Sequence, residues 1–163
     1  MASTINKKII SYKVVTAPVT PVTVMPPLEL MHEQLKRPDI LVGATYKIKP
    51  PGAEHALYVT CNDMVLNAGT VNESLFPYEI FINSKNMEHF QWILALTRLI
   101  SAIFRMGSNP TFLIHELKEI FDPKGGYLKR GVYMPSLVAE IGAIIEKHLI
   151  KIGIIIDTEA TDN

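Results

Sequence analysis

The sequence predicts an α+β domain in which an antiparallel sheet of three or four strands is packed by about three helices, the central one at residues 87–106. Apolar and polar residues alternate in residues 41–49, 57–62 and 78–83, with short connections between them. That pattern is typical of an antiparallel sheet with one covered face. Helical patterns come afterwards, and strands followed by helices favour the α+β class. A chain of 163 residues is long enough for one domain with a real core.

The first 36 residues are expected to form an extended arm, partly disordered. Four prolines lie among valines and threonines between Ala17 and Pro27, which favours a polyproline-like conformation. The arm either lacks fixed structure, as many chain ends do, or docks on this or another chain. Weak alternation at 7–15 predicts a strand. Leu28–Leu35 predicts two helical turns that end before Pro38.

Each predicted strand has one apolar face. Tyr46 and Ile48 share a face in the first strand, and Lys47 and Lys49 point the other way. The second and third strands present apolar faces made by Leu57, Val59 and Cys61, and by Tyr78, Ile80 and Ile82. The segments Pro50-Pro51-Gly52 and Asn67-Ala68-Gly69 read as breaks between strands.

The helix at 87–106 is apolar over most of its circumference. Its polar residues form one stripe, namely Glu88, Gln91, Arg98, Ser101 and Arg105, and Gly107 ends the helix. A helix with so narrow a polar stripe belongs in a core. We therefore expect Trp92, Leu96, Leu99 and Ile103 to be buried.

Two more helices are expected. One begins at Asn109-Pro110, where a capping Asn precedes a Pro of the first turn, and it ends before Asp122. The other begins at Pro135 and ends at Gly153. After it we expect a short strand at 154–156 and a disordered acidic tail at 157–163.

Composition limits the classes of function. Sixteen basic and sixteen acidic residues cancel, which argues against the net basic surface that non-specific nucleic-acid binding needs; no specific nucleic-acid binding is expected either. No apolar run of membrane-spanning length and no signal-peptide pattern appear. Cys61 is the one cysteine, so no internal disulfide can form, which is compatible with the expected cytoplasmic location.

Two polar segments beside helices are the candidate binding sites. The first contains the residues Lys124, Gly125, Gly126, Tyr127, Lys129 and Arg130. Its backbone amides and cations can hold an anion, and its Tyr can anchor a protein or stack on a base; the alternative is an ordinary linker. The second is the junction at Lys85 and Asn86, where helix-start amides attract anions. Simple capping by Ser84 or Asn86 explains its polar residues equally well.

No catalytic or metal-binding pattern stands out. The five histidines show no zinc-ligand spacing, so no metal is expected. Cys61 alternates with Val59 and Leu57 and is expected to be a small buried hydrophobe. No nucleophile–base arrangement is evident.

Six blocks in order resemble a known family. They lie at 46–49, 57–62, 77–85, 95–101, 121–127 and 134–142. Together they resemble the TSCPD domain of adenosylcobalamin-dependent (class II) ribonucleotide reductases, most of all the small, separately encoded chain of the split enzymes. The resemblance covers about residues 37–153, and we assign the α+β domain to residues 37–156. The Thr-Ser-Cys-Pro-Asp motif is missing, and Met134-Pro135-Ser136-Leu137 stands near its place.

The resemblance implies an accessory, non-catalytic component of a ribonucleotide reductase, serving deoxyribonucleotide synthesis. Its expected partner is the large reductase chain. That chain would hold adenosylcobalamin, while this chain alone binds no cofactor. The radical and reducing cysteines of such enzymes have no counterpart here. The alternative is a stand-alone binding module that forms a homo-oligomer through its apolar helices and binds a nucleotide or a protein through the loop at 124–130.

Overall fold

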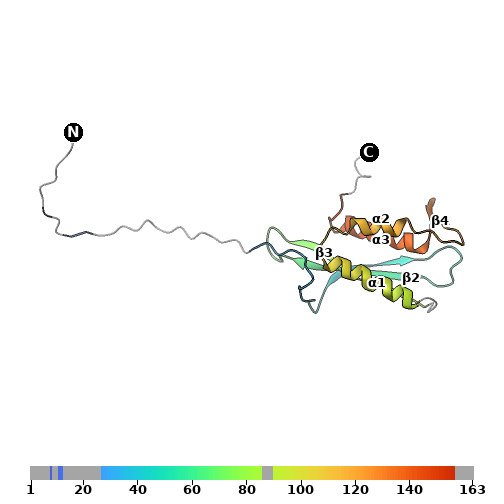
Figure 1. Cartoon of the computed structure of the whole chain (residues 1–163), viewed down its shortest axis with the longest axis horizontal. Helices are drawn as coiled ribbons and strands as arrows, with labels where there is room; N and C mark the ends of the chain where they lie inside the picture. The colour runs from blue at the N-terminus through green and yellow to red at the C-terminus, as the bar shows by residue number, and fades with distance from the viewer. Residues whose placement is uncertain (1–7, 9–10, 13–26, 86–89, 157–163) are drawn as a thin grey trace, which may run out of the picture.

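The computed structural model describes residues 8, 11–12, 27–85 and 90–156. The described elements run in the order β1 (Val42–Ile48), β2 (Leu57–Leu66), β3 (Ser74–Ser84), α1 (Phe90–Arg105), α2 (Thr111–Lys118), β4 (Tyr127–Lys129), β5 (Val132–Met134) and α3 (Leu137–Lys151). The first three strands form an antiparallel sheet in the order β1-β2-β3, and β4 and β5 form a separate hairpin (Figure 1). The predicted α+β class is confirmed. The predictions for the arm before Pro27, the strand at 7–15 and the tail at 157–163 fall mostly or wholly outside the described residues.

The helices cover one face of the sheet, here called the covered face. Its strand residues pair across the sheet: Ile48 lies opposite Leu57, and Val59 lies opposite Ile82. These side chains form one core with apolar residues of all three helices, among them Ile100, Leu117 and Leu149. The burial of Leu57, Val59 and Cys61 on this face confirms the period-two prediction.

Tyr78 does not share the covered face with Ile80 and Ile82, so this part of the sequence prediction was wrong. The β2–β3 register shifts between Asn62 and Asp63. Such a bulge places one extra residue in a strand and turns the following side chains to the other face. Tyr78 therefore packs in a second core with Met31, Met64 and Leu66, a shift that alternation alone does not reveal. Both β2 and β3 also extend beyond their predicted ends.

The opposite face of the sheet, here called the open face, is covered at one end only by the residues that the structure describes. Residues 27–41 lie over that end without forming the predicted helix, and only a turn joins the Leu35 amide to the His32 carbonyl. A segment so short gains little from helix formation, whereas burial of Met31 in the second core holds it in place. Arg37 adds a two-pronged ion pair with Glu79, at 2.9 and 3.0 Å.

The helix α1 lies along the free edge of β3. Ser101 on α1 accepts a hydrogen bond from the Ile80 amide at 3.0 Å and donates one to the Thr97 carbonyl at 2.7 Å. Edge amides left unpaired attract other strands, so this contact protects β3. The predicted polar stripe is therefore not uniformly solvated, since its member Ser101 is buried.

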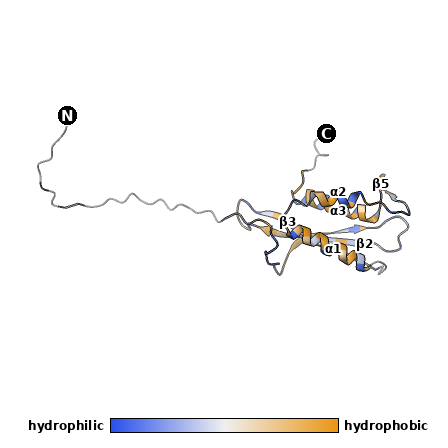
Figure 2. Cartoon of the chain, viewed as in Figure 1, coloured by the Kyte–Doolittle hydropathy of each residue, from blue (hydrophilic) through white to orange (hydrophobic). Residues whose placement is uncertain are grey.

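The prediction that Trp92 and Leu99 are buried was wrong: they are 70% and 64% exposed. Leu96 and Ile103 are half-buried against the core. The sheet and the other helices cover one side of α1, centred on Ile100 and Phe104, and leave an apolar side uncovered. The orange colour around much of α1 in Figure 2 shows how evenly its apolar residues are spread.

The remaining helices lie close to their predicted positions. Asn109 accepts a hydrogen bond from the Thr111 amide at the start of α2. Ser136 caps α3 by accepting from the Ala139 amide. Of the loop predicted at 124–131, residues 127–131 belong to the β4–β5 hairpin and residues 124–126 lie in the turn before it. Residues 154–156 form no strand.

Candidate functional site

The first predicted binding segment lies in the β4–β5 hairpin and the turn before it. Lys124 and Arg130 are exposed, and Arg130 occupies the hairpin turn with a positive φ of 51°. Gly125 also has a positive φ, 95°, and its amide donates to the Asp122 carbonyl. Gly126 lies so close to the Met134 carbonyl that a side chain would collide with it. The glycines therefore shape the turn and the hairpin packing.

Two of the predicted binding side chains already have an internal partner. Tyr127 donates its hydroxyl hydrogen to one carboxylate oxygen of Glu140, and Lys129 forms an ion pair with the other. Glu140 belongs to the first turn of α3 and is only 2% exposed. Burial, together with the Glu140 carboxylate, raises the pKa of Tyr127. These contacts fasten the hairpin to α3 and leave Lys124 and Arg130 as its exposed cations.

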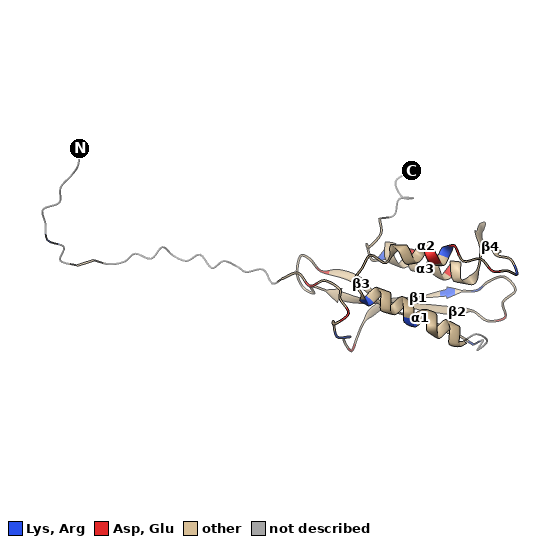
Figure 3. Cartoon of the chain, viewed as in Figure 1, with Lys and Arg blue, Asp and Glu red and all other residues tan. Residues whose placement is uncertain are grey.

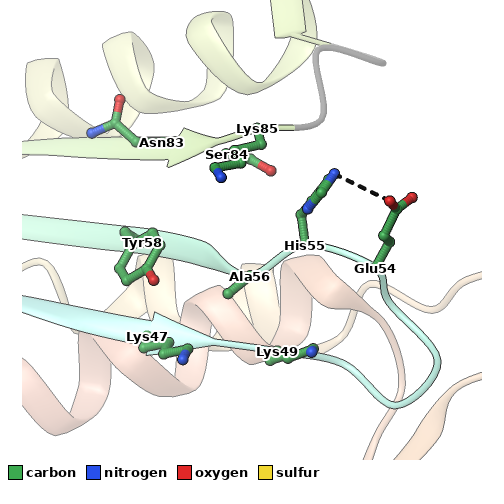
Figure 4. A pocket seen from close by; sticks show the side chains of 9 residues that line it. All are labelled: Lys47, Lys49, Glu54, His55, Ala56, Tyr58, Asn83, Ser84 and Lys85. Carbon is green, nitrogen blue, oxygen red and sulfur yellow. Dashed lines mark ion pairs between the residues drawn. The ribbon is translucent and has the colours of Figure 1, made fainter.

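The second predicted binding residue, Lys85, lies in a basic depression on the open face. The depression has a volume of about 470 Å³. Its lining includes Lys47 from β1, Lys49 just after β1, Tyr58 from β2, and Lys85 just after β3 (Figure 4). Asn86, the other predicted residue of this junction, lies outside the described residues.

Sequence reasoning missed the partners of Lys85. The strand register places Lys47 opposite Tyr58 and Tyr58 opposite Asn83. Alternation already indicated that Lys47 and Lys49 point away from the core. Combining that signal with the expected pairing of neighbouring strands would have placed both lysines near Lys85.

A second depression, of about 490 Å³, lies between β3 and α1. Its floor and walls include the apolar residues Phe81, Leu94 and Leu99, and Arg98 and Arg105 add charge. Beside it runs an exposed ridge, here called the α1 ridge, formed by Trp92, Ala95 and Leu99 of α1 and by Met106 just after it. The described part of α1 carries no acidic residue, as Figure 3 shows.

A buried polar chain connects the sheet to α3. The His148 ring lies between Asp63, whose Oδ1 is 2.8 Å from Nε2, and Tyr46, whose hydroxyl is 2.9 Å from Nδ1. An ionised Asp can only accept, so Nε2 carries a hydrogen, and in the neutral ring Nδ1 accepts from Tyr46. His148 is 2% exposed, and none of the three residues lines the depressions described above. The trio therefore acts as a structural connection.

Cys61 is buried on the covered face, as expected. Burial, with a smaller contribution from Asp63, raises its pKa to about 12, and a thiol in that state is a poor nucleophile. Among the described residues, no group of three or more His, Cys, Asp or Glu side chains could hold a metal ion. Within the same residues, no helix has the length and apolar character required to cross a bilayer.

The described elements form an α+β domain with an apolar depression beside α1 and a basic depression on the open face. The chain belongs to the TSCPD domain family, whose sequence pattern matches residues 30–149. Comparison with curated proteins and with solved structures gave no significant match.

Proposed function

We propose that this chain is an accessory, non-catalytic component of an adenosylcobalamin-dependent ribonucleotide reductase and docks on the large reductase chain through the α1 ridge and the depression beside it. Membership of the TSCPD domain family supports the proposal. The ordered sequence blocks point to the same enzymes. Cytoplasmic deoxyribonucleotide synthesis is the process in which such a component acts.

The observation that carries the docking proposal is the exposure of large apolar side chains on α1. Trp92 and Leu99 are separated by two helical turns and so project from the same side of the helix. Phe81, on β3, is also exposed and lines the adjoining depression. Contiguous exposed apolar surface marks interaction sites, and aromatic and Arg residues are enriched at the centres of protein interfaces.

The division of labour follows from the cysteine content. Ribonucleotide reduction needs a radical thiol and a pair of reducing thiols, and the sequence contains only Cys61. This thiol is buried in the core with a raised pKa. The large chain would therefore supply the reacting thiols and hold adenosylcobalamin, while this chain contributes a binding surface.

Affinity purification from the native cell tests this function. The tagged chain is expected to co-purify with a large ribonucleotide reductase chain identified by mass spectrometry. A Trp92→Glu/Leu99→Glu variant should lose that chain, because charges on the α1 ridge oppose burial. The matched control is Ile40→Glu/Val71→Glu, which changes two exposed apolar residues that do not belong to α1. Repeated purification without any reductase chain would contradict the proposal.

A further inference from the structure

The basic depression on the open face combines three lysines with an aromatic ring. Lys47 on β1 and Lys49 just after it line one side of the depression, and Lys85 lines it from just after β3. Tyr58 lies between them on β2, in register with Lys47 on one side and Asn83 on the other. The lysines thus flank a half-exposed tyrosine ring (Figure 4).

The positive charge of the depression is not balanced by its own residues. Among the described residues, Glu54 is the one acid that lines it, and that carboxylate faces His55 at 3.7 Å. Within the described residues, no ion pair or side-chain hydrogen bond involves Lys47, Lys49 or Lys85. Three like charges near one another repel, and a polyanion placed among them removes that repulsion.

The other groups of the depression suit a ring-bearing ligand. A tyrosine ring with an exposed face can stack on a nucleobase. Asn83 offers an amide with both donors and an acceptor for a base edge. The volume, about 470 Å³, falls within the usual range for small-ligand sites, about 300–1,000 Å³.

The site is also bounded, which favours a compact ligand. At the other end of the open face, residues such as Met31 and Leu35 cover the sheet, and Arg37 is held by Glu79. A single-stranded nucleic acid needs a longer track of cations and aromatic rings. A neighbouring depression shares Glu54, His55, Ser84 and Lys85 with this one and reaches Leu137, at the N-terminal end of α3.

We infer that this depression binds a nucleoside polyphosphate, with Lys47, Lys49 and Lys85 around the phosphates and Tyr58 stacked on the base. This inference does not rest on the proposed function, because the site lies on the open face and not on the α1 ridge. It differs from the sequence-based expectation of a nucleotide at residues 124–130.

Calorimetric titration of the full chain with ATP, inorganic tripolyphosphate and adenosine tests the inference. ATP should bind most tightly, and added salt should weaken its binding. Lys47→Glu/Lys85→Glu should lower ATP affinity about tenfold or more, since two charge-assisted contacts become repulsive. The control, Lys147→Glu/Lys151→Glu, makes the same charge change at exposed positions toward the opposite end of α3; it should alter the affinity by less than about twofold. Tyr58→Ala should weaken ATP but not tripolyphosphate.

Several outcomes would overturn the inference. The first is no ATP binding up to about 10 mM, which corresponds to a negligible affinity. The second is an equal loss of ATP affinity in Lys47→Glu/Lys85→Glu and in Lys147→Glu/Lys151→Glu, since ATP binding would then depend only on the net charge of the protein. The third is equal affinity for ATP and tripolyphosphate, which would indicate a simple phosphate site. The fourth is much tighter binding of a single-stranded oligonucleotide. Circular dichroism of each variant establishes that the fold is intact.

Discussion

At the residue scale, buried polar groups connect elements that are distant in the sequence. His148 joins α3 to Tyr46 on β1 and to Asp63 on β2, and Glu140 joins α3 to the β4–β5 hairpin. Buried polar groups are costly unless their hydrogen-bonding capacity is met. Among the described residues, no buried side-chain N or O atom lacks a hydrogen-bond partner.

The hydrogen bond between Tyr46 and His148 can be removed with little change of shape. Tyr46→Phe keeps the ring and deletes the hydroxyl that lies 2.9 Å from His148 Nδ1. We expect a loss of about 1 kcal/mol in the free energy of unfolding. Tyr133→Phe is the control because Tyr133 is exposed. Urea melts that give Tyr46→Phe the stability of the control would show that the bond is immaterial.

The ion pair between Arg37 and Glu79 should make stability depend on pH. Hydrogen bonding from Arg37 lowers the pKa of Glu79 in the folded chain, against an opposing effect of burial. The stabilisation is therefore fully present above the unfolded-state pKa of Glu79 and is lost as the pH falls through its folded-state pKa.

Arg37→Gln should consequently lower the melting temperature at neutral pH. The decrease relative to the wild type should become smaller as the pH falls into the acid range. Lys36→Gln, at the exposed neighbouring residue, is the control. Thermal melts over a pH series give the difference between each variant and the wild type. A difference for Arg37→Gln that stays constant from neutral to strongly acidic pH would refute the assignment.

At the scale of elements, α1 shows how sequence and structure diverge. The existence of the helix, its end at Gly107 and its order after the sheet could be predicted from apolar periodicity and glycine. Which side of it is buried could not be predicted, because nearly every side is apolar. Contact with β3 and the covered face selects Ile100 and Phe104 for the core and leaves Trp92 and Leu99 outside.

Two neighbouring residues of α1 provide a sharp test of this orientation. Ile100→Ala should cost about 2–5 kcal/mol, because Ile100 is 1% exposed and its truncation leaves a cavity. Leu99→Ala should cost less than about 0.5 kcal/mol, as surface substitutions usually do. Denaturant melts of the two variants decide the matter. Equal losses, or a larger loss for Leu99→Ala, would contradict the orientation of α1.

At the scale of the whole molecule, the sequence was sufficient for the fold class and for one member of the basic site. Strand alternation and strand order predicted the three-stranded sheet, and the polar junction after β3 drew attention to Lys85. The bulge near Asp63 and the hairpin at 127–134 were missed because both depend on pairing between strands. Lys47 and Lys49 join Lys85 through that same pairing.

The two proposed binding surfaces differ in their chemistry. The α1 ridge is apolar with nearby arginines, whereas the open face ends in lysines and a tyrosine. A variant of one surface should therefore leave binding at the other unchanged, provided that the fold is intact. The proposed docking surface and the inferred ligand site can therefore be tested, and refuted, independently of each other.

The central claim is that the α1 ridge docks on the large chain of an adenosylcobalamin-dependent ribonucleotide reductase. The most direct measurement is the dissociation constant between this chain and that large chain from the same organism, both purified. The wild type and Ile40→Glu/Val71→Glu should bind with similar affinity, and Trp92→Glu/Leu99→Glu should bind at least about thirtyfold more weakly, as expected when two central interface residues are lost. Unchanged affinity in the α1 variant, or no binding by the wild type, would contradict the claim.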